Sequence, residues 1–105
     1  MKRTITILLG FLAVPLFFAL AYGGGNSEKG KALFNDPQFA GGKAGVSCNS
    51  CHPNGENAAK GADGKGVREI INACIEKALK GKPVDPQSSQ MDDLVAYLKS
   101  VEMQQ

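Results

Sequence analysis

The sequence predicts an all-α fold of three main helices joined by two long loops. Residues 67–80 and 89–101 carry apolar side chains at the three- and four-residue spacing of a helix with one buried face. No stretch alternates apolar and polar residues as a half-buried strand does. With 105 residues, 43% hydrophobic and 21% charged, the chain has room for one small domain and excludes the large enzyme folds.

The first 21 residues have the pattern of a secretory signal peptide. Lys2 and Arg3 precede a run of almost wholly apolar residues from position 5 to position 20. Ala19-Leu20-Ala21 then has the small residues of a cleavage signal. We therefore predict a signal peptide over residues 1–21 and a mature domain over residues 22–105, in the periplasm or secreted.

The alternative for this segment is an uncleaved membrane anchor formed by residues 5–21. Its apolar run is close to the shortest length that spans a bilayer, and Pro15 interrupts it. Only in this alternative do we expect the protein to be attached to a membrane.

The mature chain has no excess of positive charge. Removing residues 1–21 leaves 84 residues with ten basic and ten acidic side chains. Nucleic acid is therefore not an expected partner, because the domain lacks a basic run. A domain of this size often needs a disulfide, a metal or a cofactor to complete its core.

The first helix is expected to begin with Ser27 as its N-cap and to run through Phe34. Glu28 in the first turn suits the helix dipole, and Asn35-Asp36-Pro37 ends the helix. A Gly-rich loop over residues 38–47 follows.

A second polar, Gly-rich loop covers residues 54–66, and the clearest helix covers residues 67–80. Gly81 is expected just after its end. One apolar stripe runs along this helix, made of Val67, Ile70, Ile71, Cys74, Ile75, Ala78 and Leu79.

The last helix is expected to start near Ser89, where Ser89 and Asp92 resemble a capping box. Its apolar face consists of Met91, Leu94, Val95, Leu98 and Val101. The loop before it, residues 82–88, contains two prolines.

Cys48, Cys51 and His52 form a C-x-x-C-H pentapeptide, the pattern of covalent haem attachment. Each thiol can add to one haem vinyl group, and the adjacent imidazole can ligate the iron from below. We therefore expect one covalently bound haem c, with its iron, to complete the small core.

Three other interpretations of these cysteines remain open. A redox disulfide of this spacing normally lies beside a strand, and no strand is predicted. A zinc site could use Cys48, Cys51, His52 and Cys74, but adjacent side chains rarely converge on one tetrahedral ion. A structural disulfide would leave one cysteine over and would give His52 no role.

With this motif, the mature chain resembles the class I cytochromes c along nearly its whole length. Gly30 and Phe34 lie in a helix before the motif, and Tyr97 lies in the final helix. The resemblance implies that these two helices cross through those residues in a cytochrome c-like fold. Residues 71–98 are more narrowly similar to small single-haem cytochromes of anaerobic and sulfur-metabolising bacteria, and to di-haem thiosulfate dehydrogenases.

The resemblance leaves two candidates for the sixth iron ligand. Met91 lies 39 residues after His52, a usual separation, and is the favoured candidate. However, it falls inside the last helix rather than in the preceding loop. Cys74 is the rival, because it resembles the cysteine that ligates one haem of the thiosulfate dehydrogenases. Met103 is too close to the C-terminus, and an open, water-bound or Lys-bound iron is the third possibility.

The resemblance implies a one-electron carrier, not an enzyme, with redox proteins as its donor and acceptor. Lys77, Lys80 and Lys82 form the densest basic group that a partner could meet, although they also suit the end of a helix. The alternative is a haem subunit of a sulfur-compound oxidising enzyme or a ligand-binding protein, using Cys74 or an open site. The mature chain has no second His, no Trp and no readable acid–base pair.

Overall fold

The computed structural model describes residues 24–58 and 66–104. Its elements are α1 (Ser27–Phe34), η1 (Phe39–Gly41), α2 (Cys48–Cys51), η2 (Pro53–Gly55), α3 (Val67–Lys77) and α4 (Ser89–Met103), where η marks a 3₁₀ turn. Every regular element in these ranges is helical, so the all-α prediction is confirmed. The predicted signal peptide over residues 1–21 lies outside the described residues. No helix within them combines the length and apolar character that crossing a membrane requires.

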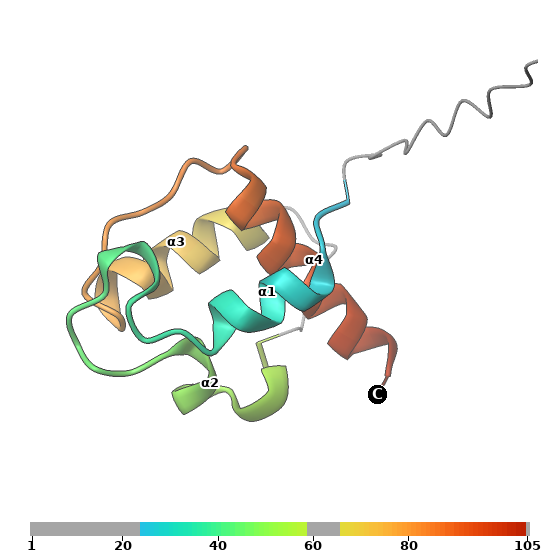
Figure 1. Cartoon of the computed structure of the whole chain (residues 1–105), viewed down its shortest axis with the longest axis horizontal. Helices are drawn as coiled ribbons and strands as arrows, with labels where there is room; N and C mark the ends of the chain where they lie inside the picture. Colours follow the sequence, from blue (N-terminus) through green and yellow to red (C-terminus); the bar gives the residue numbers. More distant parts are fainter. Residues whose placement is uncertain (1–23, 59–65, 105) are drawn as a thin grey trace, which may run out of the picture.

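Helices α1 and α4 pack directly against each other (Figure 1). A Cβ added to Gly30 would lie 1.9 Å from the Asp93 carbonyl oxygen, so only glycine allows this approach. One turn further along, the rings of Phe34 and Tyr97 meet with their centroids 5.2 Å apart and tilted by 59°. The crossing thus uses the residues that the resemblance implied.

The starts of α1 and α4 differ by one residue from the predicted caps. Asn26, not Ser27, caps α1, because its side chain accepts a hydrogen bond from the Lys29 N–H at 3.0 Å. The Asn26 N–H in turn donates to Asp93 Oδ1 at 2.7 Å, which ties this cap to α4. Ser88, not Ser89, caps α4 by accepting from the Met91 N–H at 3.2 Å.

Helix α3 ends at Lys77, three residues before the predicted end. Lys80 takes the left-handed backbone conformation expected at the following glycine, with φ at 57°. Gly81 is needed for a different reason. Its N–H donates to the Ile75 carbonyl at 2.9 Å, and an added Cβ would lie 2.7 Å from the Ala40 oxygen. The chain after α3 is therefore pressed against the loop around Ala40.

Two side chains of α3 hold the loop before α4: Asn72, and Arg68, which donates to the Pro86 carbonyl. The Asn72 amide donates to the Val84 carbonyl at 2.8 Å and accepts from the Val84 N–H at 2.9 Å. Near the other end of this loop, Arg68 on α3 forms an ion pair with Asp92 on α4 at 2.8 Å. These contacts give a Pro-rich loop a defined course beside the helix.

The core lies between α1, α4 and one end of α3. Its buried members in contact are Phe34, Phe39, Ile75, Leu79, Leu94, Tyr97 and Leu98. The apolar stripe predicted for α3 is only partly buried there. Ile75 and Leu79 reach the core, whereas Ile70 is 64% exposed and Cys74 and Ala78 are also exposed. The described chain thus leaves an apolar edge of α3 uncovered.

Candidate functional site

The C-x-x-C-H pentapeptide forms a compact helical turn, α2, where the sequence pattern alone predicted no element. The Ser47 N–H donates to Ser50 Oγ at 3.0 Å, and the Ser47 side chain caps the turn in return. The His52 N–H closes the turn on the Cys48 carbonyl at 3.0 Å. Residues three apart share a face of a helix, so this turn puts both cysteines on one side.

A small cavity gathers the chemistry-bearing residues from two helices. It has a volume of about 50 Å³ and is lined by Ser47, Cys48, Cys51, His52, Cys74, Ala78 and Leu79. Cys74 comes from the uncovered edge of α3 and the pentapeptide from α2. Three predicted cofactor residues and one rival ligand therefore share one site, although 22 or more positions of sequence separate Cys74 from the other three.

The imidazole of His52 is oriented by a backbone group. Its Nδ1–H donates to the Glu56 carbonyl at 3.0 Å, because a carbonyl oxygen can only accept. In the neutral imidazole, this hydrogen bond places the ring proton on Nδ1 and the lone pair on Nε2. Metal-binding histidines are commonly oriented in this way. The pentapeptide predicts His52 as a ligand, but it gave no sign that Glu56 would supply the acceptor.

The three cysteine thiols are all free, and they differ in exposure. Cys51 and Cys74 are exposed, whereas Cys48 is half-buried. Burial raises the pKa of the Cys48 thiol to about 11, and the nearby thiols of Cys74 and Cys51 add to the rise. Cys48 is therefore a neutral thiol at physiological pH before any attachment.

Met91 and Cys74, the two candidates for the sixth ligand, occupy different places. Cys74 lines the cavity beside His52. Met91 lies in the first turn of α4, its side chain is completely buried, and it is not among the residues that line the cavity. The described structure thus brings His52 together with Cys74 and not with Met91.

The zinc interpretation gains nothing from the observed geometry. Within residues 24–58 and 66–104, no three or more His, Cys, Asp or Glu side chains gather where they could hold one metal ion. The structure also joins none of its three cysteines in a disulfide. The four residues border a shared cavity instead of converging on one point.

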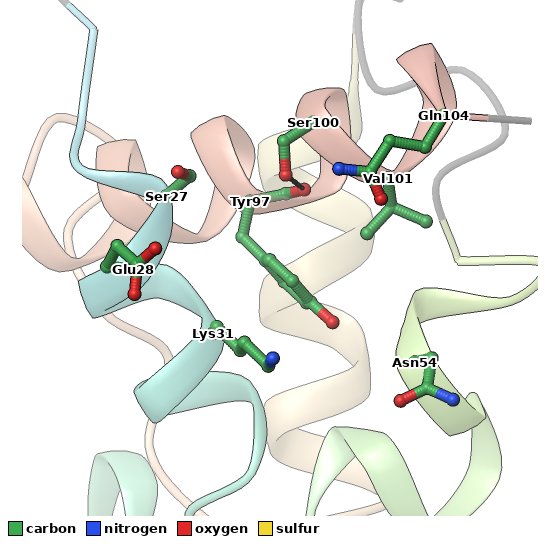
Figure 2. Close-up of a pocket in the computed structure, with 8 residues that line it drawn as sticks. All are labelled: Ser27, Glu28, Lys31, Asn54, Tyr97, Ser100, Val101 and Gln104. Carbon is green, nitrogen blue, oxygen red and sulfur yellow. Dashed lines mark hydrogen bonds between the residues drawn. The ribbon is translucent and has the colours of Figure 1, made fainter.

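A second cavity, which the sequence did not predict, lies between α1, α4 and η2 (Figure 2). Its volume is about 380 Å³, and it is lined by Ser27, Glu28, Lys31, Asn54, Tyr97, Ser100, Val101 and Gln104. In Figure 2 the Tyr97 hydroxyl points from the α1–α4 contact toward this space. The side chains that line this cavity include one cationic group, Lys31, and one carboxylate, Glu28, together with amides and hydroxyls.

The basic group predicted at Lys77, Lys80 and Lys82 is exposed. Lys77 lies between the cavity-lining Cys74 and Ala78, and the other two follow this segment. The loop before α2 adds Lys43, whose N–H donates to the Leu79 carbonyl at 2.9 Å. Because this pairing is between segments distant in sequence, the sequence gave no sign of it.

Comparisons with protein-family models, with curated proteins and with solved structures find no match to this chain.

Proposed function

We propose that this chain is a c-type cytochrome, a one-electron carrier with one haem c bound through Cys48 and Cys51 and ligated by His52. The observation that carries the proposal is that both thiols and the imidazole border one cavity while His52 Nδ1 is engaged by the Glu56 carbonyl. That arrangement leaves Nε2 as the available donor, as an axial ligand requires. When bound, the haem supplies the chemistry, a one-electron exchange between Fe(III) and Fe(II).

The residues around the cavity suit a large apolar group better than a small ion. The cavity itself, at about 50 Å³, accommodates only a part of such a group. Two of its lining residues, Cys74 on α3 and Ala78 just after α3, are exposed members of an apolar stripe that the described chain does not cover. A flat apolar cofactor held at α2 would give this edge a partner and would enlarge a thin core.

The chain's own residues then have distinct roles. The α2 turn presents the two thiols for attachment, and covalent bonds keep the group in an open site. His52 binds the metal and is held in one ring orientation by Glu56.

Cys74 favours a second candidate, a haem subunit of a sulfur-compound oxidising enzyme or a ligand-binding haem protein. Its thiol lies at the cavity, whereas Met91 is not among the residues that line it. A thioether ligand raises the reduction potential and suits a carrier, whereas a thiolate donates more electron density to the iron. The sixth ligand therefore separates the two candidates.

The experiment that tests both is an absorption spectrum of the ferric and ferrous protein, made in cells with haem-attachment machinery. We expect thioether-linked haem bands, which must vanish in the Cys48→Ser/Cys51→Ser double variant. If the unaltered protein has no covalent haem, the proposal is wrong. A far-red charge-transfer band from a methionine sulfur to the iron that disappears in Met91→Leu identifies Met91 as the sixth ligand. This result supports the electron-carrier proposal. A low-spin spectrum changed only by Cys74→Ser supports the second candidate.

For location and partners we propose a periplasmic or secreted protein that exchanges electrons with a donor and an acceptor protein. The signal-peptide pattern of residues 1–21 supports this location. Its alternative, attachment to the membrane by residues 5–21, predicts a heavier protein. The intact mass of the purified holoprotein distinguishes the two, because cleavage after Ala21 removes the first 21 residues.

A further inference from the structure

The two variable residues of the pentapeptide have different structural roles. Ser50 acts inside the α2 turn, where its Oγ accepts from the Ser47 N–H at 3.0 Å. Asn49 reaches out of the turn, since its Oδ1 accepts from the Asn54 N–H at 2.8 Å. Asn54 belongs to η2 and has a φ of 56°, in the left-handed region that costs most residues energy. Asn54 is a residue type that adopts this region readily, and Asn49 fastens the η2 turn through the Asn54 N–H.

The η2 turn presents the acceptor of His52. Within it, the Gly55 N–H donates to the His52 carbonyl at 2.9 Å, and the Glu56 N–H donates to the Pro53 carbonyl at 3.0 Å. The turn ends with the Glu56 carbonyl 3.0 Å from His52 Nδ1. The position of that oxygen therefore depends on the path of the backbone between His52 and Glu56.

Helix α4 also contacts the η2 turn, through Val101. Gly55 is buried, and an added Cβ would lie 3.0 Å from Val101 Cγ2. Figure 2 shows Asn54 of η2 and Val101 of α4 beside the same cavity. Contacts with both Val101 and Asn49 leave the turn little freedom to shift.

We infer that Asn49 is a positioning residue, which holds the Glu56 carbonyl on His52 Nδ1–H and so sets the orientation and basicity of the imidazole. The inference rests on the proposed function, in which His52 ligates the haem iron. A hydrogen bond from the far ring nitrogen to a carbonyl makes the imidazole a stronger metal donor. A stronger donor favours the ferric state, so weakening this hydrogen bond raises the reduction potential.

The test compares Asn49→Ala with Ser50→Ala in the holoprotein. Both variants delete one side chain-to-backbone hydrogen bond in the pentapeptide, but only the first releases Asn54. We expect Asn49→Ala to shift the His52 Nδ1–H proton resonance of the ferrous protein. At the wild-type midpoint its ratio of reduced to oxidised protein should rise about threefold, which is about 28 mV at 59 mV per tenfold for one electron. Ser50→Ala should leave both readouts near those of the unaltered protein.

Asn49→Asp replaces the amide oxygen by a carboxylate oxygen, which can also accept from the Asn54 N–H. The His52 Nδ1–H resonance of this variant should therefore match that of the unaltered protein, and only the resonance is compared. The inference is overturned if Asn49→Ala matches the unaltered protein in resonance and potential, or if Ser50→Ala shifts both equally. Should Asn49→Ala yield no holoprotein, hydrogen exchange of the Asn54 amide in the unaltered protein decides. Protection supports the inference, and exchange as fast as in an open chain overturns it. Failure of the proposed function shows separately, as missing thioether bands in the unaltered protein.

Discussion

Replacing Gly30 by alanine tests the helix contact on which the fold depends. The new Cβ would lie 1.9 Å from the Asp93 carbonyl oxygen and 2.8 Å from Tyr97 Cβ. Because ordinary contact begins near 3.4 Å, α1 and α4 would have to separate by about 1.5 Å at this point. The obstacle is backbone on a helix, so a side-chain rotation cannot relieve it.

The expected loss of stability follows from three contributions. Overpacking of a close contact costs about 1–3 kcal/mol, and loosening the Phe34–Tyr97 ring pair costs about 0.5–1.5 kcal/mol. Alanine in place of glycine inside a helix returns about 1 kcal/mol. We therefore expect a net loss of about 2 kcal/mol, which for a domain of this size lowers Tm by about 8–16 °C.

The assay is thermal unfolding of the holoprotein followed by helical circular dichroism. Ala32→Gly is the matched control, because Ala32 is exposed on the same helix and the reverse change tests helix propensity alone. It should cost about 1 kcal/mol. If Gly30→Ala proves as stable as the unaltered protein, the close packing of α1 on α4 is not as the structure has it.

Four other substitutions test three particular features by chemical unfolding of the holoprotein. Lys80→Gly should stabilise the protein by about 1 kcal/mol, because it relieves a left-handed lysine; a loss of stability would contradict that conformation. Ile75→Ala should cost about 2–5 kcal/mol, whereas Ile70→Ala on the exposed side of the same helix should cost under about 1 kcal/mol; equal costs would place both in the core. Asn26→Ala should cost about 1 kcal/mol through loss of the α1 cap, and no change would favour Ser27 as the capping residue.

The course of the main helices followed from local sequence signals. The spacing of apolar residues located α3 and α4, whereas a capping signal located α1 and Asn35-Asp36-Pro37 ended it as predicted. The exact caps were less predictable, since Asn26 and Ser27, like Ser88 and Ser89, are neighbours with similar chemistry. In the structure Asn26 is the cap, and its N–H also donates to Asp93 on α4, a partner 67 positions away.

The apolar stripe of α3 shows where periodicity stops being informative. The spacing of apolar residues does not show whether Ile70 and Ile75 contact the same neighbour, because both belong to one amphipathic helix. In the structure, Ile75 on α3 and Leu79 just after it reach the core, whereas Ile70 is exposed. Whether a helix lies along a core or only touches it is decided by the other elements.

By itself, the sequence determined the helical class and the C-x-x-C-H spacing of Cys48, Cys51 and His52. Both depend on residues within a few positions of one another, whereas the crossing at Gly30 came from the resemblance to a family. Only the tertiary structure decided that Cys74 borders the cavity with His52, that Met91 does not, and that Glu56 orients the imidazole. Such contacts depend on how helices and turns are placed in space, which the spacing of residues along a flexible chain does not specify.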